Sequence, residues 1–340
     1  MTDQRFYDNT RVSTHKSCER RYFYRHEMNL GSEGMPAAPA FGIAWHKACD
    51  VIWTRLDEGA ITDHDEKVGL IRDAYFAWEE AWTEFGLPSL DEMTPDFADQ
   101  FKQRTPDTAF EMIAEYIEER QDFLAHDVKL IAVEQPFAVP IKTDDENLWY
   151  CGRLDKVIQY KDGIYVVDHK TTSAYKKDGF FKSSWIDSFS PDSQIDGYAY
   201  AAHILYGDEF KGIYIDGALV HKTVHNGFCW LPVRRSIDQL DAWLWETQQE
   251  IERIEENKGR VADRELGLSY MPGYRKNTGS CFDFNTPCAF LDLCKGYANP
   301  ADEMMVLGGE APLGYSIDPW SPFDHSQLDK LGFNREDDKV

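Results

Sequence analysis

Two neighbouring strand-forming runs constrain the fold of this chain more than any other feature of its sequence. Residues 148–160 and 164–170 are rich in β-branched and aromatic side chains, and Lys161-Asp162-Gly163 between them is typical of a hairpin turn. The second run contains Tyr165-Val166-Val167 without a polar break, which indicates a strand that is buried on both faces. The hairpin is therefore expected to lie inside a sheet rather than on its surface.

The rest of the chain predicts a mixed α/β core with helical decoration. Residues 63–125 are acidic, rich in Trp and Phe and helical in period, with a break at about 86–95, and they predict a helical insertion. Further elements are expected as helices at 18–25, 41–53, 190–205 and 237–258, and as strands at 129–141 and twice within 212–233.

Charge and composition exclude several classes of protein. The 340 residues carry 36 Lys and Arg against 60 Asp and Glu, a net charge of −24, so the chain does not coat nucleic acid non-specifically. Any phosphate contact then requires a local basic patch or a bound metal. No apolar run approaches the about 20 residues of a membrane helix, and no signal core follows Met1, which predicts no membrane association and a cytoplasmic location, in the host cell if the protein is viral. The sequence contains no phosphate-binding loop of an ATP-driven motor.

Charged residues in the hairpin predict a divalent-cation site. Asp168 and Lys170 are two residues apart on a strand, so their side chains share a face. An even number of loop residues would place Asp155 across from Asp168 on that face, and an odd number would place it on the other. Two carboxylates so close repel each other unless a cation lies between them, and oxygen ligands suit Mg²⁺ or Mn²⁺.

A lysine beside such a cation is typical of phosphodiester hydrolysis. The metal lowers the pKa of a bound water, while the ammonium group orients the nucleophile and stabilises the charge that develops on the phosphate. The alternative is that these residues form ordinary cross-strand ion pairs on a solvated face. The apolar run beside them argues against it, because unpaired charges next to a buried strand are costly.

Three segments resemble a known family. Gly152-Arg-Leu-Asp155, Val166-Val-Asp168-His-Lys170-Thr-Thr and Gln194-Ile-Asp-Gly-Tyr198 are similar to motifs of the PD-(D/E)XK nuclease superfamily, specifically its RecB-like branch with an iron–sulfur cluster, which includes CRISPR-adaptation exonucleases and nuclease domains of recombination complexes. The resemblance covers roughly residues 12–296 and leaves the acidic insertion and the tail unmatched. It implies a restriction-endonuclease-like mixed central sheet flanked by helices, with the insertion at about 63–125 and a cysteine-clasped C-terminal segment. A nuclease domain at 1–296 and an acidic tail at 297–340 are expected.

The resemblance also implies catalytic roles for five residues. Asp155 and Asp168 match the metal-binding carboxylates, and Lys170 matches the catalytic lysine. Asp168 stands where many members carry Glu, which the family tolerates. Gln194 and Tyr198 share one helix face, and in the family that face orients the active site and approaches DNA.

Three more residues are expected around the metal. Gly42-Ile-Ala-Trp-His46 is similar to the family's Gly-x-x-x-His helix, whose histidine completes the metal shell. The main-chain carbonyl of His169 is a further expected ligand. Glu134 stands where the family often carries another acidic residue near the metal, although a strand carboxylate of this kind is often simply exposed.

Four of the seven cysteines predict a metal or iron–sulfur site. Cys281, Cys288 and Cys294 lie within fourteen residues, and Cys18 resembles the distant N-terminal cysteine of the iron–sulfur members. Four thiolates suit a 4Fe–4S cluster or tetrahedral zinc, and the resemblance favours the cluster. The spacing departs from the family's at one point. Six residues separate Cys281 from Cys288, the second and third cysteines of the set of four, whereas family members commonly have two residues between these positions. The remaining cysteines are expected to be small buried side chains: Cys49, Cys151 and Cys229.

Together these features predict a Mg/Mn-dependent DNA nuclease, an exonuclease acting on DNA ends or single strands in recombination, repair, CRISPR adaptation or phage DNA processing. Its expected partners are DNA and a helicase, recombinase or annealing protein. The expected phosphate contacts are Arg20, Arg21, Arg25 and Arg153, and the aromatic rings at 22–24 are expected to stack on bases. The alternatives are a non-catalytic nuclease-fold subunit that holds DNA for a larger complex and a zinc-stapled interaction protein.

Overall fold

The chain divides by its internal contacts into two units, which we describe separately. Unit 1 comprises Met1–Glu33, Pro136–Gly152 and Ile237–Val340, and unit 2 comprises Gly34–Gln135 and Arg153–Ser236. The computed structural model describes residues 4–32, 34–142, 145–176, 180–283, 286–303, 310–323 and 325–331. The domain boundary expected after residue 296 lies inside unit 1.

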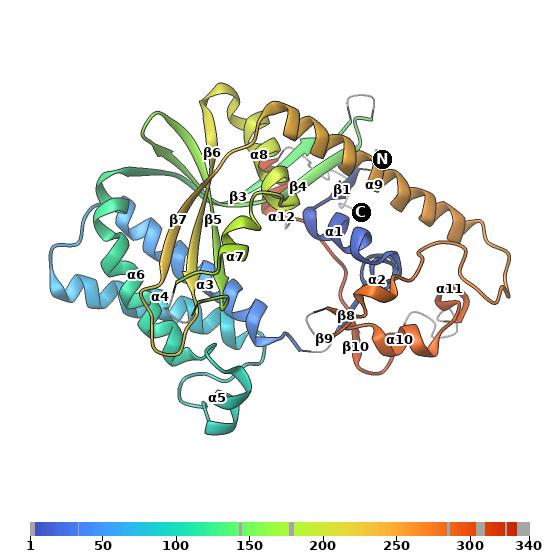
Figure 1. Ribbon diagram of the computed structural model, residues 1–340, viewed down its shortest axis with the longest axis horizontal. Helices are drawn as coiled ribbons and strands as arrows, with labels where there is room; N and C mark the ends of the chain where they lie inside the picture. Colours follow the sequence, from blue (N-terminus) through green and yellow to red (C-terminus); the bar gives the residue numbers. More distant parts are fainter. Residues whose placement is uncertain are drawn as a thin grey trace, which may run out of the picture. The chain divides into compact units, whose positions relative to one another are not determined.

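The sheet of unit 2 is built around the expected hairpin (Figure 1). Strand β4 (Leu148–Tyr160) pairs antiparallel with β5 (Gly163–Thr172), and Tyr160 lies opposite Gly163, so the turn is the two residues Lys161-Asp162. β5 pairs parallel with β6 (Phe210–Leu219), and β6 pairs antiparallel with β7 (Phe228–Val233). Strand β3 (Val128–Pro140) pairs with β4, and both strands continue into unit 1. The sheet is mixed with β5 in its interior, which confirms the predicted fold class.

The helices of unit 2 follow the predicted pattern, including the break in the acidic stretch. They are α3 (Ala37–Asp57), α4 (His64–Thr83), α5 (Pro95–Phe101), α6 (Pro106–His126), α7 (Ser183–Asp187) and α8 (Ser193–Tyr206), with a 3₁₀ turn at Gly207–Glu209. Side-chain caps define where two of them begin. The Asp63 side chain accepts from the backbone N–H groups of residues 65 and 66 in the first turn of α4. The Thr105 side chain accepts from the N–H of Thr108 in the first turn of α6, and Pro106 is the first residue of that helix. α3 packs against β5, and α8 packs against β5 and β6.

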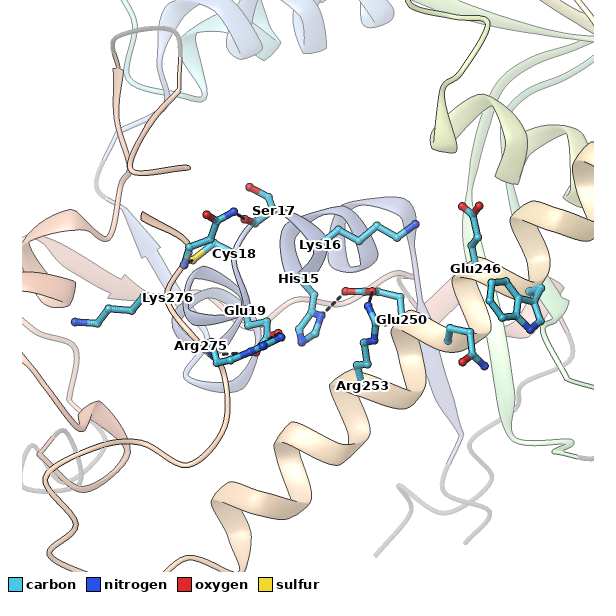
Figure 2. Close-up of a pocket in the computed structure, with 13 residues that line it drawn as sticks. His15, Lys16, Ser17, Cys18, Glu19, Glu246, Glu250, Arg253, Arg275 and Lys276 are labelled. Atoms are coloured by element: carbon cyan, nitrogen blue, oxygen red, sulfur yellow. Dashed lines mark hydrogen bonds and ion pairs between the residues drawn. The ribbon is translucent and has the colours of Figure 1, made fainter. Parts of the chain in front are cut away.

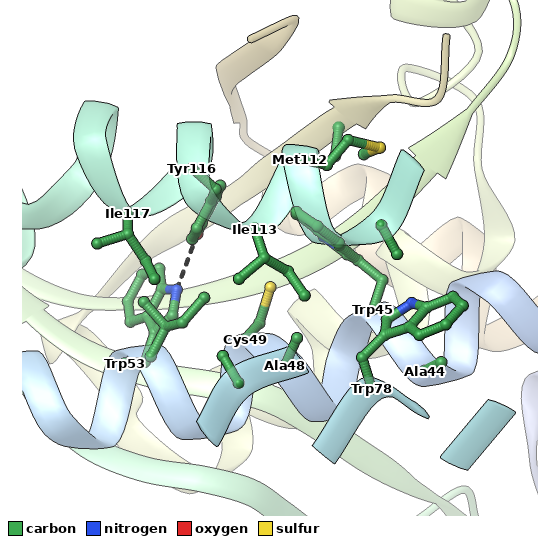
Figure 3. Packing of buried hydrophobic residues seen from close by; sticks show 14 of the residues in the cluster. Ala44, Trp45, Ala48, Cys49, Trp53, Trp78, Met112, Ile113, Tyr116 and Ile117 are labelled. Carbon is green, nitrogen blue, oxygen red and sulfur yellow. Dashed lines mark hydrogen bonds between the residues drawn. The ribbon is translucent and has the colours of Figure 1, made fainter. Parts of the chain in front are cut away.

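The core of unit 2 joins α3, α4 and α6 to the sheet. Trp45, Trp53, Trp78 and Tyr116 are fully buried there, together with Val167 of β5. Figure 3 shows α6 lying alongside α3, with the Trp53 Nε1–H donating to the Tyr116 hydroxyl at 2.9 Å. The stretch expected as an insertion therefore supplies part of the core that supports the hairpin.

Unit 1 combines the N-terminal segment with the long helix α9 and the C-terminal segment. β1 (Arg5–Tyr7) pairs parallel with the start of β4, α1 (Asn9–Ser17) packs on α9 (Ile237–Ala262), and β2 (Leu30–Ser32) pairs antiparallel with β10 (Tyr315–Ile317). Its remaining elements are α2 (Glu19–Tyr22), a π-helical turn (Phe23–Glu27), a 3₁₀ turn (Thr278–Ser280), β8 (Phe282–Asp283), β9 (Thr286–Pro287), α10 (Leu291–Gly296), α11 (Pro300–Glu303) and α12 (His325–Lys330). Among the described residues, no helix is long and apolar enough to cross a membrane.

Candidate metal centre and active site

The two-residue turn of the hairpin decides on which face Asp155 lies. Lys156 pairs with Val167, and one further step of that register places Asp155 opposite Asp168. The turn has an even number of residues, so the carboxylates of Asp155 and Asp168 lie on the same face of the sheet. The His169 N–H donates to Asp155 Oδ2 at 2.8 Å and ties the two strands together at this level. Both carboxylates are buried, with 6% of Asp155 and 1% of Asp168 exposed.

A cluster of three metal-ligating side chains forms beside this hairpin. His46 comes from α3, and its Nδ1 lies 3.3 Å from Asp155 Oδ2. Glu134 comes from β3, and one ligand atom from each of His46, Glu134 and Asp155 lies within 4.8 Å of the others. In the part of the chain that the structure describes, no other group of three His, Cys, Asp or Glu side chains converges in this way. One imidazole and two carboxylates form a donor set that fits a divalent cation of the Mg²⁺ or Mn²⁺ type.

Glu134 occupies this cluster through an unusual backbone conformation. Its φ is +50°, in the left-handed region that residues other than glycine rarely adopt. Such strain costs about 1–3 kcal/mol and persists where the surrounding structure requires it, often at functional sites. The Arg153 guanidinium forms an ion pair with the Glu134 carboxylate. Two of the sequence-predicted residues therefore contact each other at the rim of the cluster.

Lys170 lies in a row of hydrogen bonds that runs from the hairpin to α8. Its Nζ lies 2.9 Å from Asp168 Oδ1 and 2.7 Å from Oδ2, and it donates to Gln194 Oε1 at 3.0 Å. Gln194 Nε2 in turn donates to the Tyr198 hydroxyl at 3.1 Å. Asp192 caps α8 by accepting from Gln194 N at 2.8 Å, which places Gln194 at the start of that helix. Asp168, Lys170, Gln194 and Tyr198 are thus brought together as one row.

The two central carboxylates differ in how readily they ionise. Burial opposes the charged form of Asp155, but His46, His169 and Lys170 together outweigh burial and hold the pKa of Asp155 well below its usual range. Burial raises the pKa of Asp168 to about 6, a rise that Lys170 opposes and the Asp155 charge reinforces. Burial also acts to lower the pKa of Lys170, yet Asp168 and Asp155 raise it above its usual value. Lys170 is therefore a charged ammonium group, and the carboxylates around it favour a further positive charge.

Two buried charged groups of this region were not predicted from the sequence. Lys156 is fully buried on β4, and its Nζ donates to Asp50 Oδ1 on α3 at 2.6 Å. Asp216 on β6 is 1% exposed and contacts the His169 ring. The signal for Asp216 was a carboxylate inside the apolar run at 213–219, a pattern that requires a buried partner, whereas Lys156 stands beside Asp155 and near Arg153 and carried no such signal.

The four cysteines expected as ligands lie in one region of unit 1. The Asn277 backbone joins two of them, because its N–H donates to Cys18 Sγ at 3.4 Å and its carbonyl accepts from Cys281 Sγ at 3.9 Å. The N–H of Cys288 donates to the Cys281 carbonyl at 2.9 Å. Burial raises the pKa of the Cys294 thiol, and the nearby Cys18 adds to the rise. Among the described residues no three of these sulfurs lie within 4.8 Å of one another.

The prediction of phosphate and base contacts was wrong for Arg20 and for the aromatic rings that follow it. Arg20 is 4% exposed and donates from Nε to the Tyr274 carbonyl at 3.0 Å. Tyr22 stacks on Tyr274 and Tyr24 stacks on Phe290, and both tyrosines are completely buried. The helical period predicted this segment correctly, but its aromatic face turns into the core of unit 1.

The other three arginines retain partly exposed positions. Arg21 is half-buried. Arg25 pairs with Asp318, with 2.8 Å between Nη2 and Oδ2. Arg153 is half exposed and pairs with Glu134. Phosphate contact by Arg25 and Arg153 therefore requires competition with an existing carboxylate.

A pocket of about 640 Å³ in unit 1 is separate from the candidate metal ligands (Figure 2). It is lined by the end of α1, one face of α9 and residues 275–277, and Cys18 is the only sequence-predicted site residue in its lining. Its inner carboxylates already have partners, since His15 Nδ1 lies 2.6 Å from Glu250 and Arg275 lies 2.8 Å from Glu19. The lining of this pocket therefore contains none of the candidate metal ligands His46, Glu134 and Asp155, which belong to unit 2.

Comparisons with known proteins agree with the geometry. A family model described as the PD-(D/E)XK nuclease superfamily matches residues 9–295. The crystal structure of a "putative exonuclease" from Eubacterium rectale matches with a TM-score of 0.42 and 14% sequence identity, over 78% of this chain and 84% of that chain. A search of the curated proteins found no match.

Proposed function

The chain belongs to the PD-(D/E)XK nuclease superfamily, as the match over residues 9–295 shows, and we propose on this premise that it is a metal-dependent DNA exonuclease of the RecB-like branch. The observation that carries the proposal is the position of Lys170. Its ammonium group lies against the buried Asp168 and beside a cluster of three potential metal ligands that the same hairpin helps to build. A protein that only binds DNA has no need for that combination.

The proposed metal ligands are His46, Glu134, Asp155, Asp168 and the main-chain carbonyl of His169. When bound, Mg²⁺ or Mn²⁺ lowers the pKa of a water ligand and neutralises charge on the phosphate. The protein side chains position the other participants. Asp168 and Gln194 orient the Lys170 ammonium group, which donates to the phosphate, and Tyr198 holds the Gln194 amide in place.

A time course with end-labelled DNA tests this function. Single- and double-stranded substrates are incubated with Mg²⁺ or Mn²⁺, and products are resolved by length. An exonuclease shortens the DNA progressively from an end and releases mononucleotides or short oligonucleotides early. Internal cuts at early times would make the protein an endonuclease, and binding without cleavage with either metal would favour the non-catalytic, DNA-holding subunit.

We further propose that Cys18, Cys281, Cys288 and Cys294 hold a 4Fe–4S cluster that clasps the N-terminal helices to the C-terminal segment of unit 1. The contacts around Asn277 and the proximity of Cys18 to Cys294 support it. Four thiolates suit either a 4Fe–4S cluster or tetrahedral zinc, and the resemblance to iron–sulfur members is the reason to propose the cluster.

Protein purified without oxygen is expected to be brown, to absorb broadly near about 400 nm and to contain about four irons per chain. Cys288→Ser should lower the iron content and bleach the colour. Cys229→Ser is the matched control, because Cys229 is a half-buried thiol of unit 2, and it should leave both unchanged. Colourless protein with one zinc and no iron would assign the site to structural zinc.

DNA contact is proposed for Arg21, Arg25 and Arg153, and Arg20 is withdrawn from this set because it is buried. Arg21→Ala is expected to weaken DNA binding whatever the DNA sequence. It should also reduce the magnitude of the slope of log K for DNA binding against log[salt] by about one unit. Titrations at several salt concentrations in Ca²⁺ measure this slope. An unchanged slope would remove Arg21 from the contact surface.

The setting of the proposed nuclease follows from its expected chemistry. Recombination, repair, CRISPR adaptation and phage DNA processing all require trimming of DNA ends, and a helicase, recombinase or annealing protein would present such ends. We propose a cytoplasmic location, a nuclease domain at 1–296 with its helical insertion at about 63–125, and an acidic tail at 297–340.

A further inference from the structure

The buried carboxylate of Asp216 lies behind the candidate metal centre and accepts three hydrogen bonds from two other elements. The Tyr116 hydroxyl and Arg120 Nη2 reach it from α6, and Arg120 lies 3.2 Å from Oδ1. His169 Nδ1 reaches Oδ2 from β5 at 3.1 Å. A carboxylate that receives three donors in the interior is ionised, and all three hydrogen bonds favour one orientation of its oxygens.

The His169 ring is held from several sides. An ionised carboxylate can only accept, so the Asp216 contact places the proton on Nδ1. The ring lies edge-on to the rings of Trp53 and His46, with ring centroids 5.6 Å and 5.8 Å apart respectively. Its Nε2 is buried and has no hydrogen-bond partner among the described residues. Asp216 is thus the polar anchor of this ring.

The backbone of His169 connects this anchor to the metal ligands. Its N–H donates to Asp155 Oδ2 at 2.8 Å, and its neighbours in the chain are Asp168 and Lys170. His169 also lies opposite Asp216 in the parallel ladder of β5 and β6. Asp216 therefore holds the side chain of the same residue whose peptide N–H hydrogen-bonds Asp155.

We propose that Asp216, held by Tyr116 and Arg120, is a positioning residue that fixes His169 and through it the ligand geometry at Asp155. The proposal rests on the proposed metal-dependent nuclease function. It gives α6 a role in catalysis, because Tyr116 and Arg120 are four residues apart on one helix face directed at β6. Figure 3 shows Tyr116 between α6 and Trp53 of α3, which fixes its hydroxyl for this contact.

The test measures Mn²⁺ affinity by the EPR signal of free Mn²⁺, together with cleavage kinetics, in the full-length chain. Asp216→Asn keeps the shape but replaces one acceptor oxygen by an NH₂ donor, so the three donors can no longer all be accepted. We expect Mn²⁺ affinity to fall by about 10- to 100-fold and kcat to fall at limiting Mn²⁺, while the KM for DNA measured at saturating Mn²⁺ stays unchanged. Excess Mn²⁺ should restore much of the rate, whereas it should not rescue Lys170→Ala.

Two further variants separate positioning from loss of stability. Thr105→Ala removes the N-cap of α6 without touching Asp216, and it should lower the melting temperature while leaving Mn²⁺ affinity at the parental value. Tyr116→Phe keeps the ring but removes the hydroxyl that donates to Asp216 and accepts from Trp53 Nε1–H, and it should weaken Mn²⁺ binding even if Asp216→Asn does not fold. The Tyr116→Phe/Asp216→Asn double variant should bind Mn²⁺ no more weakly than Asp216→Asn alone, because both changes act through one carboxylate.

The outcomes distinguish this proposal from the function on which it rests. Folded Asp216→Asn and Tyr116→Phe proteins that bind Mn²⁺ and cut DNA like the parent would overturn the positioning role and leave the nuclease assignment standing. A loss of Mn²⁺ affinity in Thr105→Ala equal to that in Tyr116→Phe would also overturn it, because stability would then explain both. A parental protein that neither binds Mn²⁺ nor cuts DNA would overturn the proposed function itself.

Discussion

Replacing Lys170 by alanine is expected to lower the rate of DNA cleavage by at least about 10²- to 10³-fold and to leave the fold intact. The Lys170 ammonium group is the charged donor of the site, held between Asp168 and Gln194, and alanine removes its interaction with the developing charge on the phosphate. Asp168→Ala should cause a loss of at least the same order, because it removes a proposed metal ligand and the partner of Lys170. Initial rates on end-labelled DNA measure both effects, and circular dichroism reports the fold.

Lys161→Ala is the matched control for this experiment. Lys161 lies in the turn of the same hairpin, exposed to solvent over the Tyr160 ring, and contacts none of the proposed site residues. It should cut DNA at the parental rate. An Asp168→Ala protein that retains the parental rate would overturn the assignment of the site, whereas equal losses in Lys161→Ala and Lys170→Ala would point to a general effect of charge.

Removing divalent metal is expected to abolish cleavage completely and to weaken DNA binding strongly. At a net charge of −24 the long-range field of the chain repels a polyanion, and the cluster of His46, Glu134 and Asp155 adds negative charge where the phosphate must lie. Protein treated with a chelator should therefore bind DNA poorly and cut none. Mg²⁺ or Mn²⁺ should restore cleavage, and Ca²⁺ should restore binding without efficient cleavage, because it bridges carboxylates and phosphate but orients them less strictly.

The metal prediction has a direct control in the chain. Asp155→Asn should weaken the response to every one of these ions, whereas Asp208→Asn, on the exposed turn before β6, should leave it unchanged. If DNA binding is equally tight with chelator and after Arg21, Arg25 and Arg153 are all changed to alanine, the electropositive surface lies elsewhere on the chain or on a partner protein.

Local patterns in the sequence predicted the framework of the site. Period-two alternation places Asp168 and Lys170 on one face whatever the rest of the chain does, whereas the sequence left open the length of the turn, and the structure decided the face of Asp155 with a two-residue turn. Helical spacing likewise aligns Gln194 with Tyr198, whose side chains are hydrogen-bonded in the structure. These features depend on residues close together in the chain, so their geometry follows from the backbone period alone.

Only the tertiary structure decided which faces are buried and which distant groups meet. The segment at 18–25 has a helical period that is compatible with a DNA-binding surface, yet packing against Tyr274 and Phe290 buries its rings and Arg20. Lys170 pairs with Asp168 because a buried carboxylate requires a nearby cation, a contact that strand alternation permits but does not require.

The backbone conformation of Glu134 and the contacts of Asp216 could not be predicted from local sequence patterns for the same reason. The backbone of Glu134 adopts a positive φ, and Asp216 meets Tyr116 from a helix a hundred positions away in sequence. By itself the sequence determined the main strands of the sheet from β3 to β7, the longer helices and the charged residues of the hairpin. The tertiary structure alone determined the partners of each buried charge, because those partners are chosen by the packing of elements far apart in the chain.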